Sequence, residues 1–268
     1  MVPEGLDDDG HIAREGSLAK VAPEFAPVVD HARRLVAARF GPDRLHSAYL
    51  YGSIPRGTAL PAVSDLDLLL ALRHRPTPAD RADADGVEAT LDAAHPQIDG
   101  AGVLLFSTDT LLSDLERHDL GWFLACLCTP LLGDDLADRL PRYRPTSLLA
   151  RETNGDLALL LPRWRERAAA ARTDAELRTL SRGAARKLVR TGLTLVMPRW
   201  GGWTSDLAGS AEIFARYYPA RGPQMRLAAT IARTPTTDPA VIAALLDDLA
   251  PWLAAEYTAT HGVKAPRP

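Results

Sequence analysis

The stretch YGSIPRGTALPAVSDLDLL, residues 51–69, decides the fold. It joins two predicted strands, residues 45–51 and 65–72, through a turn that begins with a Gly-Ser pair. Alternate side chains of a strand share a face, so Asp65 and Asp67 should point the same way, with Cα atoms roughly 6–7 Å apart. Two carboxylates on one face repel each other unless a divalent cation lies between them. The pair therefore predicts a Mg²⁺ site, since Mg²⁺ is held by one or two carboxylates together with phosphate oxygens.

The other polar groups of this stretch suit an anion. Gly52 and Ser53 follow a strand end at a predicted helix start, where backbone amides and a hydroxyl can hold phosphate. Arg56 adds a fixed positive charge. Taken singly, each feature has an ordinary interpretation: Asp-x-Asp is common at solvated strand edges, and Gly-Ser is common in turns.

Around this stretch, the first half of the chain alternates strands and helices. Apolar residues at helical spacing run from Phe25 to Phe40, and Gly41-Pro42 should end that helix. The further elements predicted here are a helix at 79–94, a strand at 103–106, a helix at 108–118 and a strand at 126–132. We expect the first domain to end near residues 143–145.

The second half carries helical signals only. Thr173 and Glu176 form a capping box, and Asp238-Pro239 is a second helix start. The sequence therefore predicts a flexible segment at 1–20, a first domain at 21–143, a helical bundle at 146–260 and a flexible tail at 261–268.

Composition excludes several classes of protein. The 268 residues are 46% apolar with a formal net charge of −3, which argues against disorder and against binding of an extended nucleic acid. Cys126 and Cys128 are too few for a disulfide scaffold, so we expect buried, reduced thiols. The longest apolar stretch, residues 120–132, is shorter than the roughly 20 residues of a membrane span. We expect a cytoplasmic protein without membrane contact.

Taken together, the Gly-Ser pair, the Arg-Gly at 56–57 and the Ser-Asp-Leu-Asp of residues 64–67 resemble the signature of the polymerase-β-like nucleotidyltransferases. The chain looks most like the small bacterial branch that contains aminoglycoside adenylyltransferases and kanamycin nucleotidyltransferase. The resemblance is strongest over residues 45–72 and only architectural in the second half. It implies an α+β N-terminal nucleotidyltransferase domain, with a small mixed sheet flanked by helices, followed by an all-α helical bundle.

The resemblance also implies roles for particular residues. Asp65 and Asp67 would be catalytic and hold one or two Mg²⁺ ions, and Gly52 and Ser53 would bind the nucleotide, with Arg56 and Ser64 in support. Relatives usually carry a third carboxylate on a neighbouring strand. The candidate is Asp99, as a catalytic residue and metal ligand, although the acid would be expected nearer residue 101, and Asp99 is alternatively a turn residue.

Eight residues of the second half are further candidates. Lys187 and Arg190 share a helix face, which is either solvated or used to bind the nucleotide. The general base would be Asp99, or else Glu152 or Asp156. Trp200, Trp203, Tyr217 and Tyr218 wall an acceptor pocket or belong to the core.

The expected activity is transfer of a nucleoside monophosphate, AMP from ATP by default, to a hydroxyl of a small, aminoglycoside-like acceptor, with release of pyrophosphate. Two alternatives stay open: an antitoxin-like protein nucleotidyltransferase and a nucleotide-binding pseudoenzyme. The acceptor, the base preference and the oligomeric state are not determined by the sequence.

Overall fold

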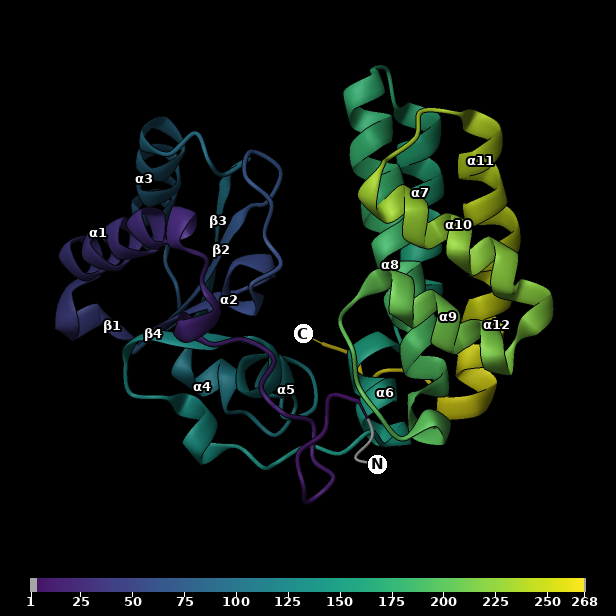
Figure 1. Ribbon diagram of the computed structural model, residues 1–268, viewed down its shortest axis with the longest axis horizontal. Helices are drawn as coiled ribbons and strands as arrows, with labels where there is room; N and C mark the ends of the chain where they lie inside the picture. The colour runs from purple at the N-terminus through teal and green to yellow at the C-terminus, as the bar shows by residue number, and fades with distance from the viewer. Residues whose placement is uncertain (1–3, 268) are drawn as a thin grey trace. The chain divides into compact units, whose positions relative to one another are not determined.

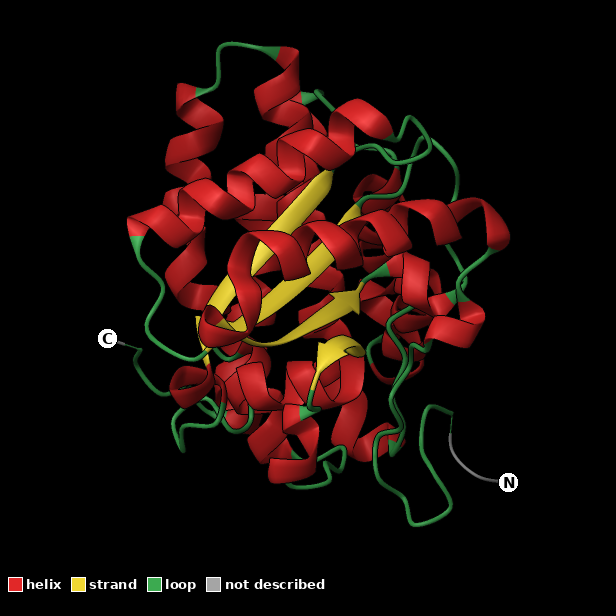
Figure 2. Ribbon diagram, turned by 90° about the vertical axis from the view of Figure 1, so that its left-hand side faces the viewer, coloured by secondary structure: helices red, strands yellow, loops and turns green. Residues whose placement is uncertain are grey.

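The two strands that flank the decisive stretch are neighbours in one sheet. The structure is a computed structural model that describes residues 4–267. Its contacts divide the chain into a sheet unit, residues 13–142, and a helical unit, residues 4–12 with 143–267. The sheet has the order β3-β2-β1-β4 (Figure 2). Its strands are β1 (Leu45–Tyr51), β2 (Leu66–Leu72), β3 (Ala101–Ser107) and β4 (Thr129–Gly133).

The sheet is mixed. β1 pairs antiparallel with both β2 and β4, while β3 runs parallel to β2. In this register Tyr51 lies opposite Asp67, and Asp67 lies opposite Gly102. The end of β1 therefore meets the start of β2, which brings the Gly-Ser turn next to the Asp-x-Asp pair.

Helices and short turns surround this sheet, and α1 and α3 pack against each other (Figure 1). The elements are η1 (Leu18–Lys20), η2 (Pro23–Phe25), α1 (Ala26–Arg44), α2 (Ser53–Arg56), α3 (Pro78–Ala94), α4 (Thr108–Leu111), α5 (Leu120–Trp122), η3 (Phe123–Leu127) and η4 (Leu136–Arg139).

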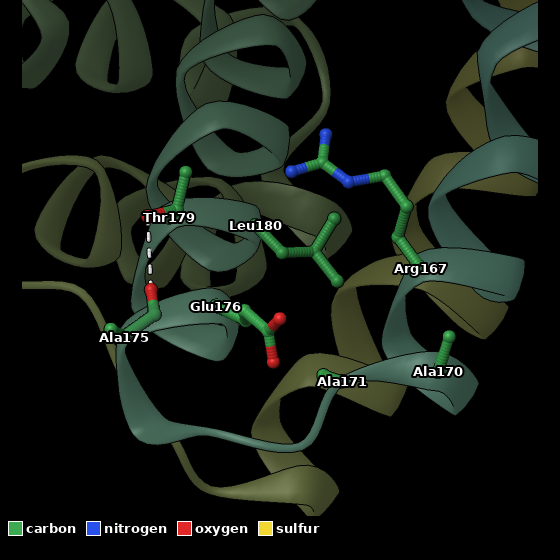
Figure 3. Close-up of a pocket in the computed structure, with 7 residues that line it drawn as sticks. All are labelled: Arg167, Ala170, Ala171, Ala175, Glu176, Thr179 and Leu180. Atoms are coloured by element: carbon green, nitrogen blue, oxygen red, sulfur yellow. Dashed lines mark hydrogen bonds between the residues drawn. The ribbon is translucent and has the colours of Figure 1, made fainter.

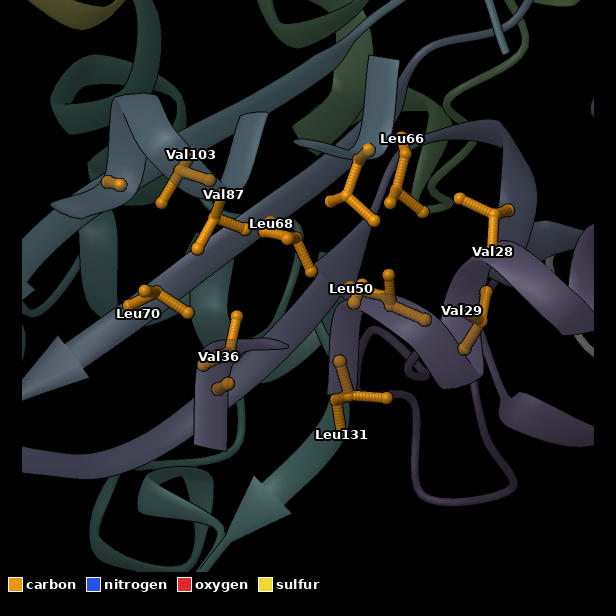
Figure 4. Close-up of a cluster of buried hydrophobic side chains, with 14 of the residues drawn as sticks. Val28, Val29, Val36, Leu50, Leu66, Leu68, Leu70, Val87, Val103 and Leu131 are labelled. Atoms are coloured by element: carbon orange, nitrogen blue, oxygen red, sulfur yellow. The ribbon is translucent and has the colours of Figure 1, made fainter. Parts of the chain in front are cut away.

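Alternation along β2 separates two apolar clusters. Leu66, Leu68 and Leu70 are fully buried against α1 and α3 in the larger cluster (Figure 4). Leu69 and Ala71 point to the smaller cluster on the other face. Asp67 is on the same side of β2 as Leu69, so the carboxylate lies at the end of a sheet face whose remaining length is apolar.

The open edge of β3 is covered by side chains of α3. Glu88 accepts a hydrogen bond from the Val103 amide at 2.8 Å, and Asp92 accepts one from the Ala101 amide at 2.7 Å. Arg81 donates to the Val103 carbonyl at 2.7 Å. At the start of β3, backbone groups that an edge strand usually leaves open are thus paired within the unit.

In the helical unit, α8 is the central helix and contacts α6, α7, α9, α10 and α12 (Figure 1). None of the helices between residues 4 and 267 has the length and apolar character of a membrane span. The elements are α6 (Ser147–Asn154), α7 (Leu157–Ala170), α8 (Asp174–Trp200), α9 (Leu207–Tyr217), η5 (Pro219–Arg221), α10 (Gly222–Arg233), α11 (Pro239–Ala243), η6 (Ala244–Leu249) and α12 (Ala250–His261).

This architecture confirms the predicted fold class, a small mixed sheet flanked by helices and then a helical region. Several element boundaries differ. α1 continues past the predicted stop at Gly41-Pro42 to Arg44, with non-helical φ and ψ at Gly41, and β3 begins two residues earlier than predicted, at Ala101. The helix predicted at 108–118 ends at Leu111, because the Ser113 hydroxyl bonds the Thr110 carbonyl at 2.9 Å and competes with helical hydrogen bonding. The strand predicted from residue 126 begins at Thr129, because the Cys126 carbonyl instead accepts the Glu15 amide at 3.0 Å.

Both ends of the described chain make specific contacts, whereas the sequence predicted flexible segments at 1–20 and 261–268. Residues 1–3 and 268 lie outside the described part. The Ile12 amide donates to the Tyr143 carbonyl at 2.7 Å, and the Lys264 amide donates to the Gly155 carbonyl at 3.1 Å. The boundary between the two units, at 142/143, lies beside the predicted end of the first domain at 143. Residues 13–20, which the sequence assigned to a flexible segment, belong to the sheet unit.

The two cysteines are buried, free thiols, as predicted. Burial raises the pKa of Cys126 to about 12. Neither thiol is therefore a nucleophile at neutral pH.

Stability should fall on mild acidification because of a histidine pair in the sheet unit. His31 Nδ1 and His95 Nε2 are 2.8 Å apart, and burial followed by the charge of His31 lowers the pKa of His95 below 6.5. The unfolded chain then binds the proton more tightly, so the free energy of unfolding decreases as the pH falls through 6.5 towards the lower folded pKa. Urea unfolding from about pH 7.5 to about pH 5.5 measures the loss.

His95→Gln should reduce this pH dependence without abolishing it, because the pKa values of His46 and His261 are lowered by burial too. An unchanged slope in that variant contradicts the assignment to the pair.

Candidate active site at the junction of β1 and β2

Gly52 and Ser53 form a turn directly after β1. Gly52 has φ +84° and ψ −154°, a conformation essentially restricted to glycine, and it caps the single helical turn α2. Ile54, the second residue of α2, is buried in the larger apolar cluster and anchors the turn. The Ser53 carbonyl accepts the Thr58 amide at 3.1 Å. The backbone conformation of the turn is therefore fixed by these contacts.

The Asp67 carboxylate lies against this turn. A Cβ atom on Gly52 would be 2.4 Å from Asp67 Oδ2, and one on Gly102 would be 3.9 Å from Oδ1. The charge of Asp67 adds to the effect of burial in raising the pKa of Cys128. Asp67 thus lies between two glycine backbones, with an apolar thiol nearby.

Asp65 and Ser64 precede β2. Asp65 is exposed and directly precedes β2, and the alternation of a strand predicts that it lies on the same face as Asp67. The Ser64 hydroxyl accepts the Leu60 amide at 2.9 Å, and the Ser64 amide donates to the Leu60 carbonyl at 3.0 Å. Ser64 therefore closes the loop that leads into the Asp-x-Asp pair.

Asp99 is exposed in a bend two residues before β3. Its amide donates to the Ser64 carbonyl at 3.1 Å, so its backbone lies beside the residue that precedes Asp65. The residue opposite Asp67 on β3 is Gly102, and β3 itself contains no acidic residue. The role of Asp99 as the third carboxylate stays a prediction.

Arg56 ends α2 and forms an ion pair with Glu15, with Nη1 and Oε2 3.7 Å apart. The sequence prediction assigned Arg56 to the nucleotide and did not identify Glu15. A carboxylate four elements away from the motif leaves no signal in a single sequence.

The candidates from the second half all lie in the helical unit. Lys187 Nζ is 2.7 Å from Asp156 Oδ1, and Arg190 is exposed three residues further along α8. Glu152 is buried and accepts hydrogen bonds from Arg151 at 2.9 Å and Arg267 at 3.1 Å. Burial favours a higher Glu152 pKa, but these hydrogen bonds outweigh burial and lower it. Such a carboxylate is a weak base, which disfavours Glu152 as the general base.

The aromatic residues of the helical unit pack among themselves. Trp203 is buried, and Tyr218 stacks on Phe214 with ring centroids 5.2 Å apart. Arg199 lies over the rings of Tyr217 and Tyr218 at 5.0 and 5.2 Å. Burial favours the core interpretation for Trp203, whereas Trp200, Tyr217 and Tyr218 are half-buried, and their place in an acceptor pocket stays a prediction.

Two other polar features of the helical unit have structural explanations. Asp7, Asp9 and His11 lie close together, but Asp7 Oδ1 accepts the amides of Asp9 and His11 at 3.0 Å, as in a side-chain-closed turn. The pocket between α7 and α8 is lined by three alanines and Leu180 together with Arg167, Glu176 and Thr179 (Figure 3). The Glu176 carboxylate already caps α8 by accepting the Thr173 amide at 3.0 Å.

The junction of β1 and β2 is suited to a hard cation and a phosphate. Asp65 and Asp67 supply carboxylate oxygens, which Mg²⁺ prefers. The Asp67 carboxylate can lie against the turn because residue 52 has no side chain, since a Cβ there would be 2.4 Å from Oδ2. By the chemistry of their donor atoms, Asp65 and Asp67 would fit a Mg²⁺ ion.

Gly52→Ala should destabilise the sheet unit by about 1–3 kcal/mol, because alanine is strained at this φ and its methyl group would displace Asp67. Gly100→Ala is the matched control, since a Cβ there meets no atom within 4 Å. The free energy of unfolding in urea measures both. Equal stability of the two variants contradicts the close contact between Gly52 and Asp67.

Comparison with solved structures shows a similar fold in spectinomycin adenyltransferase AAD(9) from Enterococcus faecialis, crystallised with ATP and spectinomycin. The two chains are 12% identical with a TM-score of 0.50, and the match covers 87% of this chain and 98% of the other. No protein-family model matches the sequence, and no curated protein sequence matches it. At this level of identity, the likeness concerns the fold alone.

Proposed function

We propose that this protein is a nucleotidyltransferase that moves AMP from ATP onto a hydroxyl group of a small, aminoglycoside-like molecule and releases pyrophosphate. The observation that carries the proposal is the Asp67 carboxylate, 2.4 Å from the position of a Cβ on Gly52, at the junction where the Gly-Ser turn and the Asp-x-Asp pair meet. The similarity of fold to AAD(9), which was crystallised with ATP and spectinomycin, supports the donor and the acceptor class.

The reaction needs the acceptor oxygen in line with the α-phosphorus and stabilisation of the pyrophosphate as it leaves. A Mg²⁺ ion held by Asp65 and Asp67 would neutralise the charge that develops on the transferring phosphoryl group. The backbone amides and the Ser53 hydroxyl of the Gly52 turn would bind the triphosphate. The glycine at residue 52 lets phosphate and carboxylate approach the same backbone.

Asp99, which lies two residues before β3, is the proposed general base. Its exposed carboxylate would accept the proton of the acceptor hydroxyl. Lys187 and Arg190 are proposed to bind the nucleotide from α8. The Lys187–Asp156 ion pair then has to open or turn for Lys187 to reach an anion.

The test is a screen of hydroxyl-bearing acceptors with ATP and Mg²⁺, read by the mass of the product and by pyrophosphate release. A gain of one adenylyl group, the mass of AMP less one water, on an acceptor, with one pyrophosphate per transfer, is the expected result. ATP binding without a product from any acceptor would favour the pseudoenzyme, and the lack of an acidic residue on β3 already suits that alternative. Absence of Mg²⁺-dependent ATP binding would reject the site.

A further inference from the structure

Residues 14–20, here called the N-terminal strap, run across α2. The Ser17 amide donates to the Pro55 carbonyl at 2.9 Å, and Glu15 pairs with Arg56. Within the strap, Lys20 Nζ donates to the Glu15 carbonyl at 2.8 Å. The strap is thus hydrogen-bonded to the last part of the helical turn that begins at Ser53.

The strap is also anchored to the segment before β4. The Glu15 amide donates to the Cys126 carbonyl at 3.0 Å, and Arg14 Nε donates to the Ala125 carbonyl at 3.0 Å. Arg14 Nη1 forms an ion pair with Asp135 at 2.7 Å. One short segment therefore links α2 to a part of the sheet unit that lies far from it in sequence.

Gly16 is the point of closest approach. A Cβ atom there would be 2.4 Å from Thr129 Oγ1 and 3.1 Å from Pro55 Cβ. The Thr129 side chain is 2% exposed and its hydroxyl has no hydrogen-bond partner among the described residues, so it does not swing aside into solvent. The strap can lie between α2 and β4 only because residue 16 has no side chain.

We infer that the N-terminal strap positions the Gly52–Ser53 turn. α2 has only four residues, and a single helical turn is not stable without outside contacts. Ile54 fixes it from the core side, while Ser17, Glu15 and Gly16 fix it through Pro55 and Arg56. The benefit to nucleotide binding rests on the proposed function, whereas the hold on the turn does not.

The first experiment follows hydrogen exchange in Gly16→Ala. Amides of residues 53, 54 and 56–58 should exchange about tenfold faster than in the wild type, while those of β2 keep their rates. Gly100→Ala should leave both regions unchanged. A Thr129→Ala substitution added to Gly16→Ala removes the clashing hydroxyl and should restore most of the protection. Unchanged exchange at 53–58, or equal acceleration throughout the sheet, would overturn the inference.

The second experiment measures binding and turnover in Glu15→Gln, which keeps the size of the side chain and removes the charge facing Arg56. The KM for ATP should rise about fivefold with kcat changed less than twofold, because the turn binds substrate and does not react. An equal fall in kcat, or no change in KM, contradicts the positioning role. If the wild type neither binds ATP nor turns over, the proposed function fails, and the exchange experiment still decides the role of the strap.

Discussion

Asp67→Asn is expected to lower nucleotidyl transfer by about 10³-fold or more, because one carboxylate fewer removes several kcal/mol of charge stabilisation from a phosphoryl transition state. The fold should stay intact. Asparagine has nearly the same shape, and removing one of two neighbouring negative charges relieves repulsion. Asp65→Asn should behave in the same way.

Mg²⁺-dependent pyrophosphate release and urea unfolding together measure this prediction. Asp109→Asn is a suitable control, since this exposed acid of α4 lies outside the junction of β1 and β2. Wild-type turnover in both Asp65→Asn and Asp67→Asn would remove the carboxylate pair from the active site.

Leu66→Asp should unfold the sheet unit, whereas Asp67→Asn, at the neighbouring residue, should leave it folded. Leu66 is 0% exposed in the cluster on α1 and α3, so the new carboxylate would be buried without a partner. Such a charge costs several kcal/mol, a large part of the roughly 5–15 kcal/mol that stabilise a domain. Substitutions at the adjacent residues 66 and 67 should therefore differ in outcome. The first should abolish the fold, and the second should abolish activity while the fold remains.

Circular dichroism and the urea midpoint measure this effect, and Leu66→Ala provides a graded comparison, expected to cost about 2–5 kcal/mol. A folded Leu66→Asp variant would show that β2 has another register than the one described.

The strands of the site were predicted well from the sequence because local signals mark where each strand begins and ends. β1 has the predicted limits, Leu45–Tyr51, since an apolar run lies there between Gly41-Pro42 and Gly52. β2 begins one residue later than predicted. The capping box of α8 is present as predicted, since both of its members lie within four residues of each other.

Contacts across the chain could not be predicted in the same way. The approach of Asp67 to Gly52 depends on the pairing of Tyr51 with Asp67 across a long loop, and the position of Gly102 depends on the register of β3. The strap was predicted to be flexible because its residues are aperiodic. Its order comes from backbone hydrogen bonds and from the fit of Gly16 against Thr129, which leave no periodic pattern.

The α3 side chains on β3 have a consequence for behaviour at high concentration. The outward amides of Ala101 and Val103 already donate hydrogen bonds to Asp92 and Glu88. These two amides are therefore not available to pair with a strand from another molecule. Lateral growth of the sheet from chain to chain, the route to fibrillar deposits, is thereby disfavoured at the start of β3.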